Sequence, residues 1–414
     1  MRKSAPRDTG LKLVSVRVTG TQRYTQAEVV AASGLNLGAP ATEDDFKKAT
    51  QELGDTGLFT NLSYSYASSS AGTKLDLELV DNDKLVSARF ENFVWFPDDV
   101  LMATIQQTVP LFKGEVPLGG ELSDAVSDAL QTILLKHSLS ARADYIRESD
   151  GENGPVHAVV FRATGLNIRV HDVTFPGAGP AEMAELSAAA KRLLDTEYLR
   201  SDIGAYAKAE LLPVYQKHGF LRTSFANAQP KVVQEDSDVI QVDVAIPVNP
   251  GPQYKVASIS WQGNTVFPAE KFEPLLHLKT GESANAIQLR KDLEQVHKLY
   301  GTRGYMTASV KPEEQLDNAA ATVAYQLEVN EGEVFHLGDL DFLGVDTKTA
   351  DRLRGAWELR DSDPYDTSYP QRFIKEAWKL LPASSNWTVS VHEAVNEKDK
   401  TVDLTLRYVL APGS

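Results

Sequence analysis

The sequence is marked first by what it does not contain. Its 414 residues include no cysteine, which excludes disulfide bonds and thiolate metal sites. No stretch approaches the roughly 18 consecutive apolar residues that a membrane-spanning helix needs. The formal net charge of −15 repels a phosphate backbone and argues against nucleic acid as a partner. No apolar segment follows residues 1–7, so we expect either a cytosolic chain or one whose secretion signal has been removed.

Motifs of the common enzyme classes are also missing. There is no Gly-Lys dipeptide of a phosphate loop, no Gly-x-Ser-x-Gly elbow and no Gly-x-Gly-x-x-Gly fingerprint. The eight histidines are scattered, without the spacing of a metal site on a helix. Paired acids at 44–45 and 98–99 stand where helices are expected to begin, and negative charge is favourable there. We therefore expect no catalytic residue, no metal, no cofactor and no enzymatic activity.

The overall composition is that of ordinary soluble domains, with 42% apolar and 24% charged residues. A chain of 414 residues is too long for a single hydrophobic core, so several domains are expected. Large aromatic side chains in small domains usually fill the core. We therefore expect Trp261, Trp357 and Trp387 to be core residues, although the alternative is that they mark a ligand face.

One pattern recurs along the whole chain. A strand-like segment of alternating residues leads into a glycine or asparagine turn, where a positive backbone φ is tolerated. These turns stand 72 to 86 residues apart, at Gly20, Asn92, Gly177, Gly263 and Gly344. The recurrence predicts five tandem modules, with boundaries at 1–80, 81–163, 164–249, 250–331 and 332–414. Because the linkers are short, we expect an elongated chain.

The fourth module shows its elements most fully. Residues 256–261 alternate as a half-buried strand, and a short helix is expected at about 269–276. A second helix then ends at a glycine turn that includes Gly304. Strands at 305–311 and 321–329 close the module. The polar segment 313–318 is expected to separate these two strands, so that the module is β-α-α-β-β.

The second helix of every module carries an apolar stripe. Pro213 interrupts the stripe of the third module and predicts a kink, because proline removes a helical N–H. The second and fifth modules have no glycine after this helix. The stripes, in chain order, are Phe46, Ala49 and Leu53; Leu122, Val126, Ala129 and Ile133; Ile203, Ala207, Leu211 and Val214; Leu289, Leu293, Val296 and Tyr300; and Tyr369, Phe373, Ala377 and Leu380.

The repeated unit resembles the POTRA domain, the periplasmic module of the BamA family of outer-membrane assembly factors. The resemblance is carried by Trp261-Gln262-Gly263-Asn264, by Gly304-Tyr305 and by the segment 329–332 of the fourth module. It extends over nearly the whole chain, and five such units resemble the amino-terminal half of a BamA protein. It implies an α+β fold of five tandem POTRA-like modules, each a small three-stranded mixed sheet packed by two helices.

The resemblance also implies a function. The chain would be a non-enzymatic periplasmic scaffold at the outer membrane, one that receives unfolded outer-membrane proteins and docks accessory assembly lipoproteins. The C-terminal membrane barrel of the family is not among these 414 residues, which leaves open whether it follows in the native gene. The alternative is a structural POTRA arm of another secretion or cell-division assembly that binds no client directly. An enzyme is the third alternative, and no motif favours it.

The binding site is expected at the edge of a sheet. If the third strand lies beside the first, as the resemblance implies, the second strand stands at an edge and can accept an extended peptide. The candidate edges are 61–66, 223–228 and 305–311. The preferred site is in the third module because its segment is small and uncharged; the alternative is an edge that is merely solvated or shielded. That segment consists of Thr223, Ser224, Phe225, Ala226 and Asn227.

Overall fold

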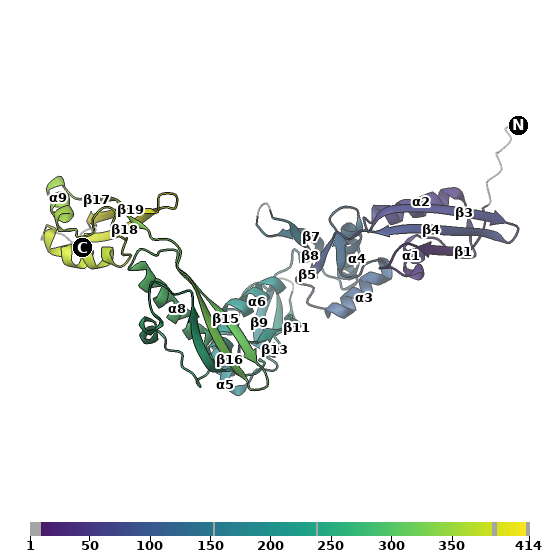
Figure 1. Cartoon of the computed structure of the whole chain (residues 1–414). Helices are drawn as coiled ribbons and strands as arrows, with labels where there is room; N and C mark the ends of the chain where they lie inside the picture. The colour runs from purple at the N-terminus through teal and green to yellow at the C-terminus, as the bar shows by residue number, and fades with distance from the viewer. Residues whose placement is uncertain (1–9, 152–153, 237–238, 383–386, 411–414) are drawn as a thin grey trace. The chain divides into compact units, whose positions relative to one another are not determined.

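The computed structural model describes residues 10–151, 154–236, 239–382 and 387–410 (Figure 1). In this part of the chain, no helix is both long and apolar enough to cross a membrane. The chain divides into two compact units. The first unit consists of Met1–Ala209 and Phe225–Val248, and the second of Glu210–Ser224 and Asn249–Ser414.

The first module forms a sheet in the order β2-β1-β4-β3, with two helices on one face. Both helices begin at a threonine, Thr25 or Thr42, whose side chain accepts a backbone N–H. The carboxylate three residues later accepts the backbone N–H of that threonine. The predicted stripe of the second helix is buried, as expected. The elements are β1 (Leu11–Thr19), α1 (Gln26–Ala32), β2 (Pro40–Ala41), α2 (Glu43–Asp55), β3 (Phe59–Ser69) and β4 (Gly72–Asp81).

The second module has the order β6-β5-β8-β7, and its second helix buries the predicted stripe. Asp98 and Asp99 lie in the first turn of a helix, as the sequence indicated. After the second helix Ser138 adopts a positive φ of 58° without being a glycine. The elements are β5 (Leu85–Phe90), α3 (Asp98–Thr108), β6 (Glu115–Pro117), α4 (Leu122–Lys136), β7 (Arg142–Ser149) and β8 (Val156–Thr164).

The third module has the order β11-β12-β9. The predicted interruption at Pro213 is confirmed, because a π-helical turn separates two short α-helices and Pro213 stands at the start of the second. The elements are β9 (Ile168–Thr174), α5 (Pro180–Ala190), α6 (Arg200–Tyr206), the π-turn η1 (Ala207–Leu211), α7 (Leu212–Lys217), β10 (Ser224–Phe225), β11 (Gln229–Glu235), β12 (Ile240–Ala245) and β13 (Val248–Asn249).

The fourth module has the order β14-β16-β15 and departs from the sequence prediction in its first helix and in its second strand. The expected helix at 269–276 consists of two 3-10 turns, since Pro274 cannot continue a regular helix there. The acidic segment 313–318, expected between two strands, lies mostly inside the second of them. The elements are β14 (Lys255–Gln262), η2 (Ala269–Lys271), η3 (Glu273–Leu275), α8 (Ala286–Gly301), β15 (Ser309–Asp317) and β16 (Thr322–Asn330).

The fifth module has the order β17-β19-β18. Its first helix is capped by Asp346, which accepts the backbone N–H of Thr349. Two tryptophans predicted to be core residues are found there: Trp357 packs 4.7 Å from the ring of Phe373, and Trp387 packs against the same core. The elements are β17 (His336–Leu343), α9 (Thr347–Ala356), α10 (Tyr369–Ala377), η4 (Trp378–Leu380), β18 (Trp387–Asn396) and β19 (Thr401–Leu410).

One topology is common to these sheets. Each module has three main strands when the short strands β2, β6, β10 and β13 are not counted. The first main strand pairs in parallel with the third, and the second pairs antiparallel with the third, so the third is central. Alternate residues of the central strand β4 are buried against the helices, namely Leu75, Leu77 and Leu79. The predicted order of first, third and second strand is confirmed. The module boundaries and the elongated shape stay predictions.

Candidate functional site

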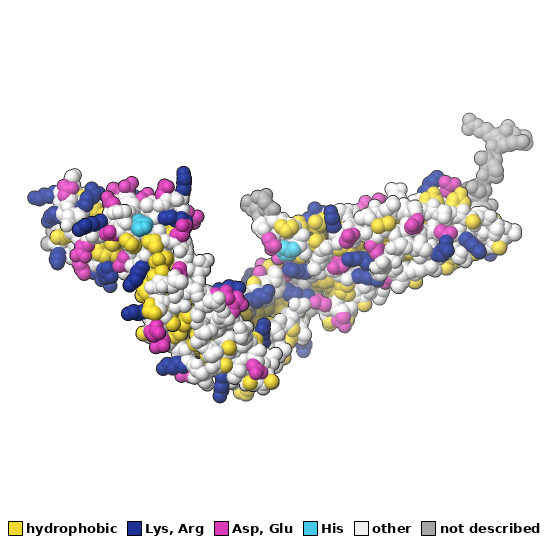
Figure 2. All heavy atoms as spheres, viewed as in Figure 1, with side chains coloured by type: hydrophobic (Ala, Val, Ile, Leu, Met, Phe, Trp, Pro, Cys, Tyr) yellow, Lys and Arg dark blue, Asp and Glu magenta, His cyan; other side chains and the backbone are white. Residues whose placement is uncertain are grey.

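The described residues offer little for small-molecule chemistry. Within the described ranges, no group of three or more His, Asp or Glu side chains could hold a metal ion. A shallow pocket of about 120 Å³ lies beside the first two modules, too small for a typical cofactor. Positive and negative side chains are interspersed over the visible face of each unit (Figure 2), so that face has no large field of one sign.

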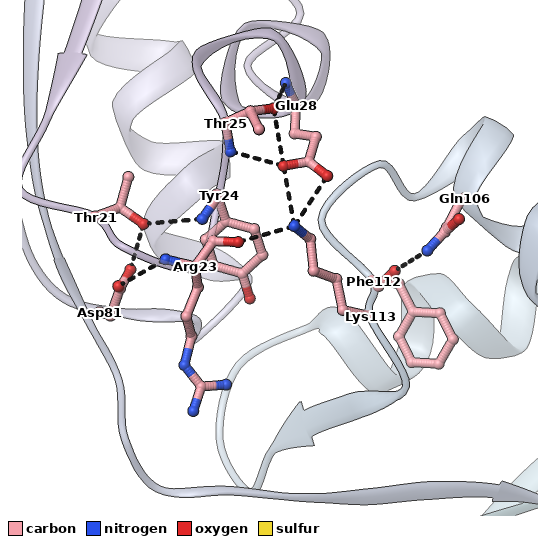
Figure 3. Close-up of polar contacts among 9 residues, drawn as sticks. All are labelled: Thr21, Arg23, Tyr24, Thr25, Glu28, Asp81, Gln106, Phe112 and Lys113. Carbon is pink, nitrogen blue, oxygen red and sulfur yellow. Dashed lines mark hydrogen bonds and ion pairs between the residues drawn. The ribbon is translucent and has the colours of Figure 1, made fainter.

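That pocket lies where the first and second modules of one compact unit meet (Figure 3). Lys113 crosses from the second module, and its Nζ donates to the Arg23 carbonyl at 2.8 Å and to the Glu28 carboxylate at 3.1 Å. Its ammonium also lies 5.2 Å from the centre of the Tyr24 ring. Glu28 holds the N-terminus of α1 by accepting the backbone N–H of Thr25 at 2.7 Å. These contacts join the two modules to each other.

The second strand of each module ends its sheet and exposes backbone groups along one side. These strands are β3, β7, β11, β15 and β18. An unpaired row of N–H and C=O groups is a template to which another strand can add. Such edges are the candidate functional sites of the molecule.

The predicted site in the third module does not lie on the edge strand. Ser224 and Phe225 form the short strand β10, which pairs with β13. The N–H of Ala226 donates to the Pro247 carbonyl at 2.9 Å, and the Thr223 hydroxyl donates to the Pro250 carbonyl at 2.9 Å. Asn227 follows in a segment without regular structure. The predicted strand 223–228 is therefore wrong, and the edge strand is β11, which begins at Gln229.

The sequence contained a signal for β11. In a hairpin the second strand directly precedes the third, so its position can be counted back from Ile240, where β12 begins. Pro230 and Lys231 lower the strand propensity of this segment, because proline is rare inside sheets. At an edge, however, a proline is tolerated, since the missing N–H need not bind a neighbour. Pro312 in β15 follows the same rule, and β15 begins at Ser309 rather than at Tyr305 as predicted.

Most of these edges carry features that oppose the addition of a strand. β7 contains Arg142, Asp144, Arg147 and Glu148 among its eight residues. β11 contains a proline with Lys231 and Glu235, and β15 contains a proline with four charged residues. β18 contains a single carboxylate, Glu393, which accepts a hydrogen bond from Tyr365 at 2.6 Å. Charges and prolines at edges are the usual protection against further pairing.

β3 is different from the other edges. Its eleven residues, Phe59–Ser69, include no charged residue and no proline. From Asn61 to Ser69 its register with β4 continues without interruption. The predicted edge 61–66 lies within it, so the sequence located this strand correctly. β3 is therefore the least protected of the five edges.

Comparison with known proteins finds a family match for the fourth module and similar proteins for longer parts of the chain. The POTRA family (surface antigen variable number repeat) matches residues 254–332. The outer membrane protein assembly factor BamA of Neisseria meningitidis is 25% identical over 193 residues, which are 46% of this chain and 24% of that protein. The BamA of Buchnera aphidicola is 18% identical over 411 residues, 94% of this chain and 63% of that protein.

A solved structure is also similar. The POTRA3-5 region of Haemophilus influenzae BamA has 20% identity and a TM-score of 0.44, over 58% of this chain and 95% of that one. The match to the Neisseria protein spans about a quarter of that relative's length, and the match to the Buchnera protein just under two thirds. The family match and the relatives support the interpretation of this chain as a POTRA region of the BamA family.

Proposed function

We propose that this chain is a periplasmic scaffold for the assembly of outer-membrane β-barrel proteins. In this role it receives unfolded clients by strand addition at its sheet edges, works beside a membrane barrel and docks accessory lipoproteins. The relatives that support the proposal are named outer membrane protein assembly factors. This chain matches only part of the length of those relatives, so the function of the complete proteins is proposed for it.

The exposed second strands carry the proposal. In each module this strand pairs on one side only with the central strand, so its outer N–H and C=O groups are available for an incoming chain. Main-chain hydrogen bonds recognise an extended conformation largely without regard to sequence. A receptor for many different β-barrel proteins needs this tolerance, because its clients share strands rather than a common sequence.

The predicted residues 223–227 stay in the proposal only as the segment that leads into the edge strand of the third module. They precede β11, the edge strand of the third module, and the Ala226 N–H already donates to Pro247. Replacing Ala226 by proline would therefore remove an internal hydrogen bond rather than an edge donor. Val233, which is exposed in the middle of β11, is a better place to probe that edge.

Site-specific photo-crosslinking tests this function. A photoreactive residue replaces Ser65 in β3, Val233 in β11 or Ser390 in β18, and in a control it replaces Lys48, which is exposed on α2. A urea-denatured outer-membrane barrel protein is then diluted into each variant. We expect crosslinks from edge positions and few from Lys48. Equal yields at all positions, or none at any, would contradict strand addition and favour a structural arm that binds no client.

A further inference from the structure

We infer that β3 of the first module is the principal receiving edge, and that it selects extended segments in which apolar and polar residues alternate. The inference rests on the proposed function and adds two things to it: one edge among five, and the chemistry of the segment that this edge prefers. It departs from the sequence prediction, which favoured the third module.

The choice of β3 follows from the difference between the edges. β7, β11 and β15 each carry charged residues, and β11 and β15 also carry a proline. β18 carries a carboxylate, Glu393, on the row of side chains that faces its helices, since it pairs with the buried Leu404. An inward charge of this kind opposes the addition of a strand. β3 carries none of these features along Phe59–Ser69.

The two faces of β3 differ in chemistry. On the face that meets the helices stand Leu62, Tyr64 and Tyr66, which pair with the buried residues Leu79, Leu77 and Leu75 of β4. On the opposite face stand Asn61, Ser63, Ser65 and Ala67, which are small and exposed. One face of the edge is therefore a row of large side chains, and the other is a row of small ones.

The row of large side chains is held in place before any ligand arrives. The Tyr66 hydroxyl donates to the Glu43 carboxylate of α2 at 3.0 Å, and Glu43 also pairs with Lys47 at 3.0 Å. The ring of Phe46 lies 5.3 Å from the ring of Tyr66 and 6.5 Å from that of Tyr64. Even so, Tyr66 is still 43% exposed, so its ring offers surface to a neighbour. Side chains ordered in advance lose little entropy on binding.

A strand added to β3 must continue this alternation, because successive side chains point to opposite faces. Every second residue of the incoming segment lies beside Leu62, Tyr64 and Tyr66, and gains most if it is apolar or aromatic. The residues between lie beside the serines, where polar side chains stay solvated. Favourable cross-strand pairs contribute roughly 0.2–1 kcal/mol each, so the three pairs with Leu62, Tyr64 and Tyr66 imply a preference of about tenfold.

Two synthetic peptides test the inference on the whole chain by fluorescence anisotropy. They have the same composition of valine, tyrosine, threonine, serine and lysine; one alternates apolar and polar residues strictly, and its isomer clusters the apolar ones. We expect the alternating peptide to bind about tenfold more tightly. The double variant Tyr64→Ser/Tyr66→Ser should reduce that preference to about twofold or less. The variant Tyr145→Ser is the matched control, because Tyr145 stands in the edge strand β7 and donates to Asp124 of α4 at 2.9 Å. It should leave the preference unchanged.

A second pair of variants leaves the tyrosines in place. Ser65→Lys puts a charge in the middle of β3, and Ser390→Lys does the same in β18. We expect the first to weaken binding of the alternating peptide at least about fivefold and the second to leave it unchanged. Equal binding of the two isomers, or an effect of Ser390→Lys without one of Ser65→Lys, would overturn the inference but leave strand addition standing. Failure of both peptides to bind, with no crosslinks at any edge, would overturn the proposed function as well.

Discussion

Two joints between modules are built from different chemistry, although the modules share one topology. Within the second unit, the fourth and fifth modules meet through backbone. The carbonyl of Gly304, a residue with a φ of 84°, accepts the N–H of Phe335 at 2.8 Å. The N–H of Thr367 donates to the Gly301 carbonyl at 3.1 Å. Gly219 and Gly57 occupy the equivalent position after the second helix and also have a positive φ.

Within the first unit, the second and third modules meet through side chains and charge. Nη1 of Arg200 donates to both carboxylate oxygens of Asp98 at 2.8 Å, and the Arg200 side chain is only 18% exposed. The buried carboxylate of Glu91 accepts the N–H of Ser201 at 2.9 Å. The indole N–H of Trp95 donates to a Glu235 oxygen at 3.4 Å.

The difference shows that one fold can join its copies in two ways. At Gly304 backbone packs against backbone, and that contact depends on shape rather than on ions. Where the helix ends in Ser138 instead of glycine, an ion pair and a capping carboxylate join the modules. Steric fit should respond to the size of a side chain, whereas the ionic joint should respond to charge and salt.

The largest effect is expected from Gly304→Val. A Cβ there would lie 2.6 Å from the Phe335 carbonyl oxygen, in a backbone conformation that penalises any Cβ. We expect the free energy of unfolding of the second unit to fall by about 3 kcal/mol, measured by denaturant titration. Gly281→Val is the control, because Gly281 has a φ of 86° and, among the described residues, no atom within 4 Å of its Cβ position. It should cost only about 1–2 kcal/mol. Equal losses would show that the close approach to Phe335 is unimportant.

The next effect is expected from Arg200→Leu. This change removes a charge-assisted hydrogen bond to Asp98 and should weaken the joint by about 2 kcal/mol. Since the chain has no cysteine, spin labels can be attached at Leu135→Cys in α4 and Met183→Cys in α5. We expect the distance distribution between them to broaden. Arg89→Leu is the control, because it breaks an exposed ion pair within the second module and should cost less than about 1 kcal/mol. An unchanged distribution in Arg200→Leu would mean that other contacts hold this joint.

Ionic strength should affect the two joints differently, and this effect should be smaller than that of the substitutions. Raising the ionic strength from about 0.05 M to about 1 M screens charged contacts, and it does so only in part where a guanidinium is mostly buried. The same labels should therefore report slight broadening between the second and third modules. A second pair of labels, at Gln315→Cys and Lys348→Cys in the fourth and fifth modules, should report none. Broadening of the second pair alone would contradict the distinction.

The smallest effect is expected from the titration of Glu331, which lies in the linker after β16. Partial burial acts to raise the pKa of Glu331, but hydrogen bonds from Thr265, Val266 and Tyr300 together hold that pKa below its ordinary value of 4.5. The pKa is lowered by folding, so the stabilisation is present above the ordinary value and is lost as the pH falls through the folded value. The stability difference between the wild type and Glu331→Gln should stay constant from about pH 7 to 5 and shrink below about 4.5. A difference that persists at low pH would assign the effect to packing.

The repeated order of elements follows from the sequence alone, because turns and apolar stripes depend on neighbouring residues. Gly304 is an example. A residue that tolerates a positive φ was predicted after the second helix, and the φ of Gly304 is 84°. The stripe of Phe46, Ala49 and Leu53 likewise identified the buried face of α2. These features depend on residues a few positions apart, so a pattern can reveal them.

Which segments form edge strands, and how the modules meet, depends on contacts between residues that are far apart in the sequence. β11 forms despite Pro230, and β15 includes Glu313 and Glu314, because the hydrogen bonds of the central strand outweigh weak local preferences at an exposed edge. The partnership of Asp98 with Arg200 joins residues 102 positions apart, and no spacing rule connects them. The chemistry of β3 as an edge also depends on a neighbour, α2, whose Glu43 holds Tyr66 in place. Pairing across long distances in the chain is a property of the folded state, so local sequence could not specify it.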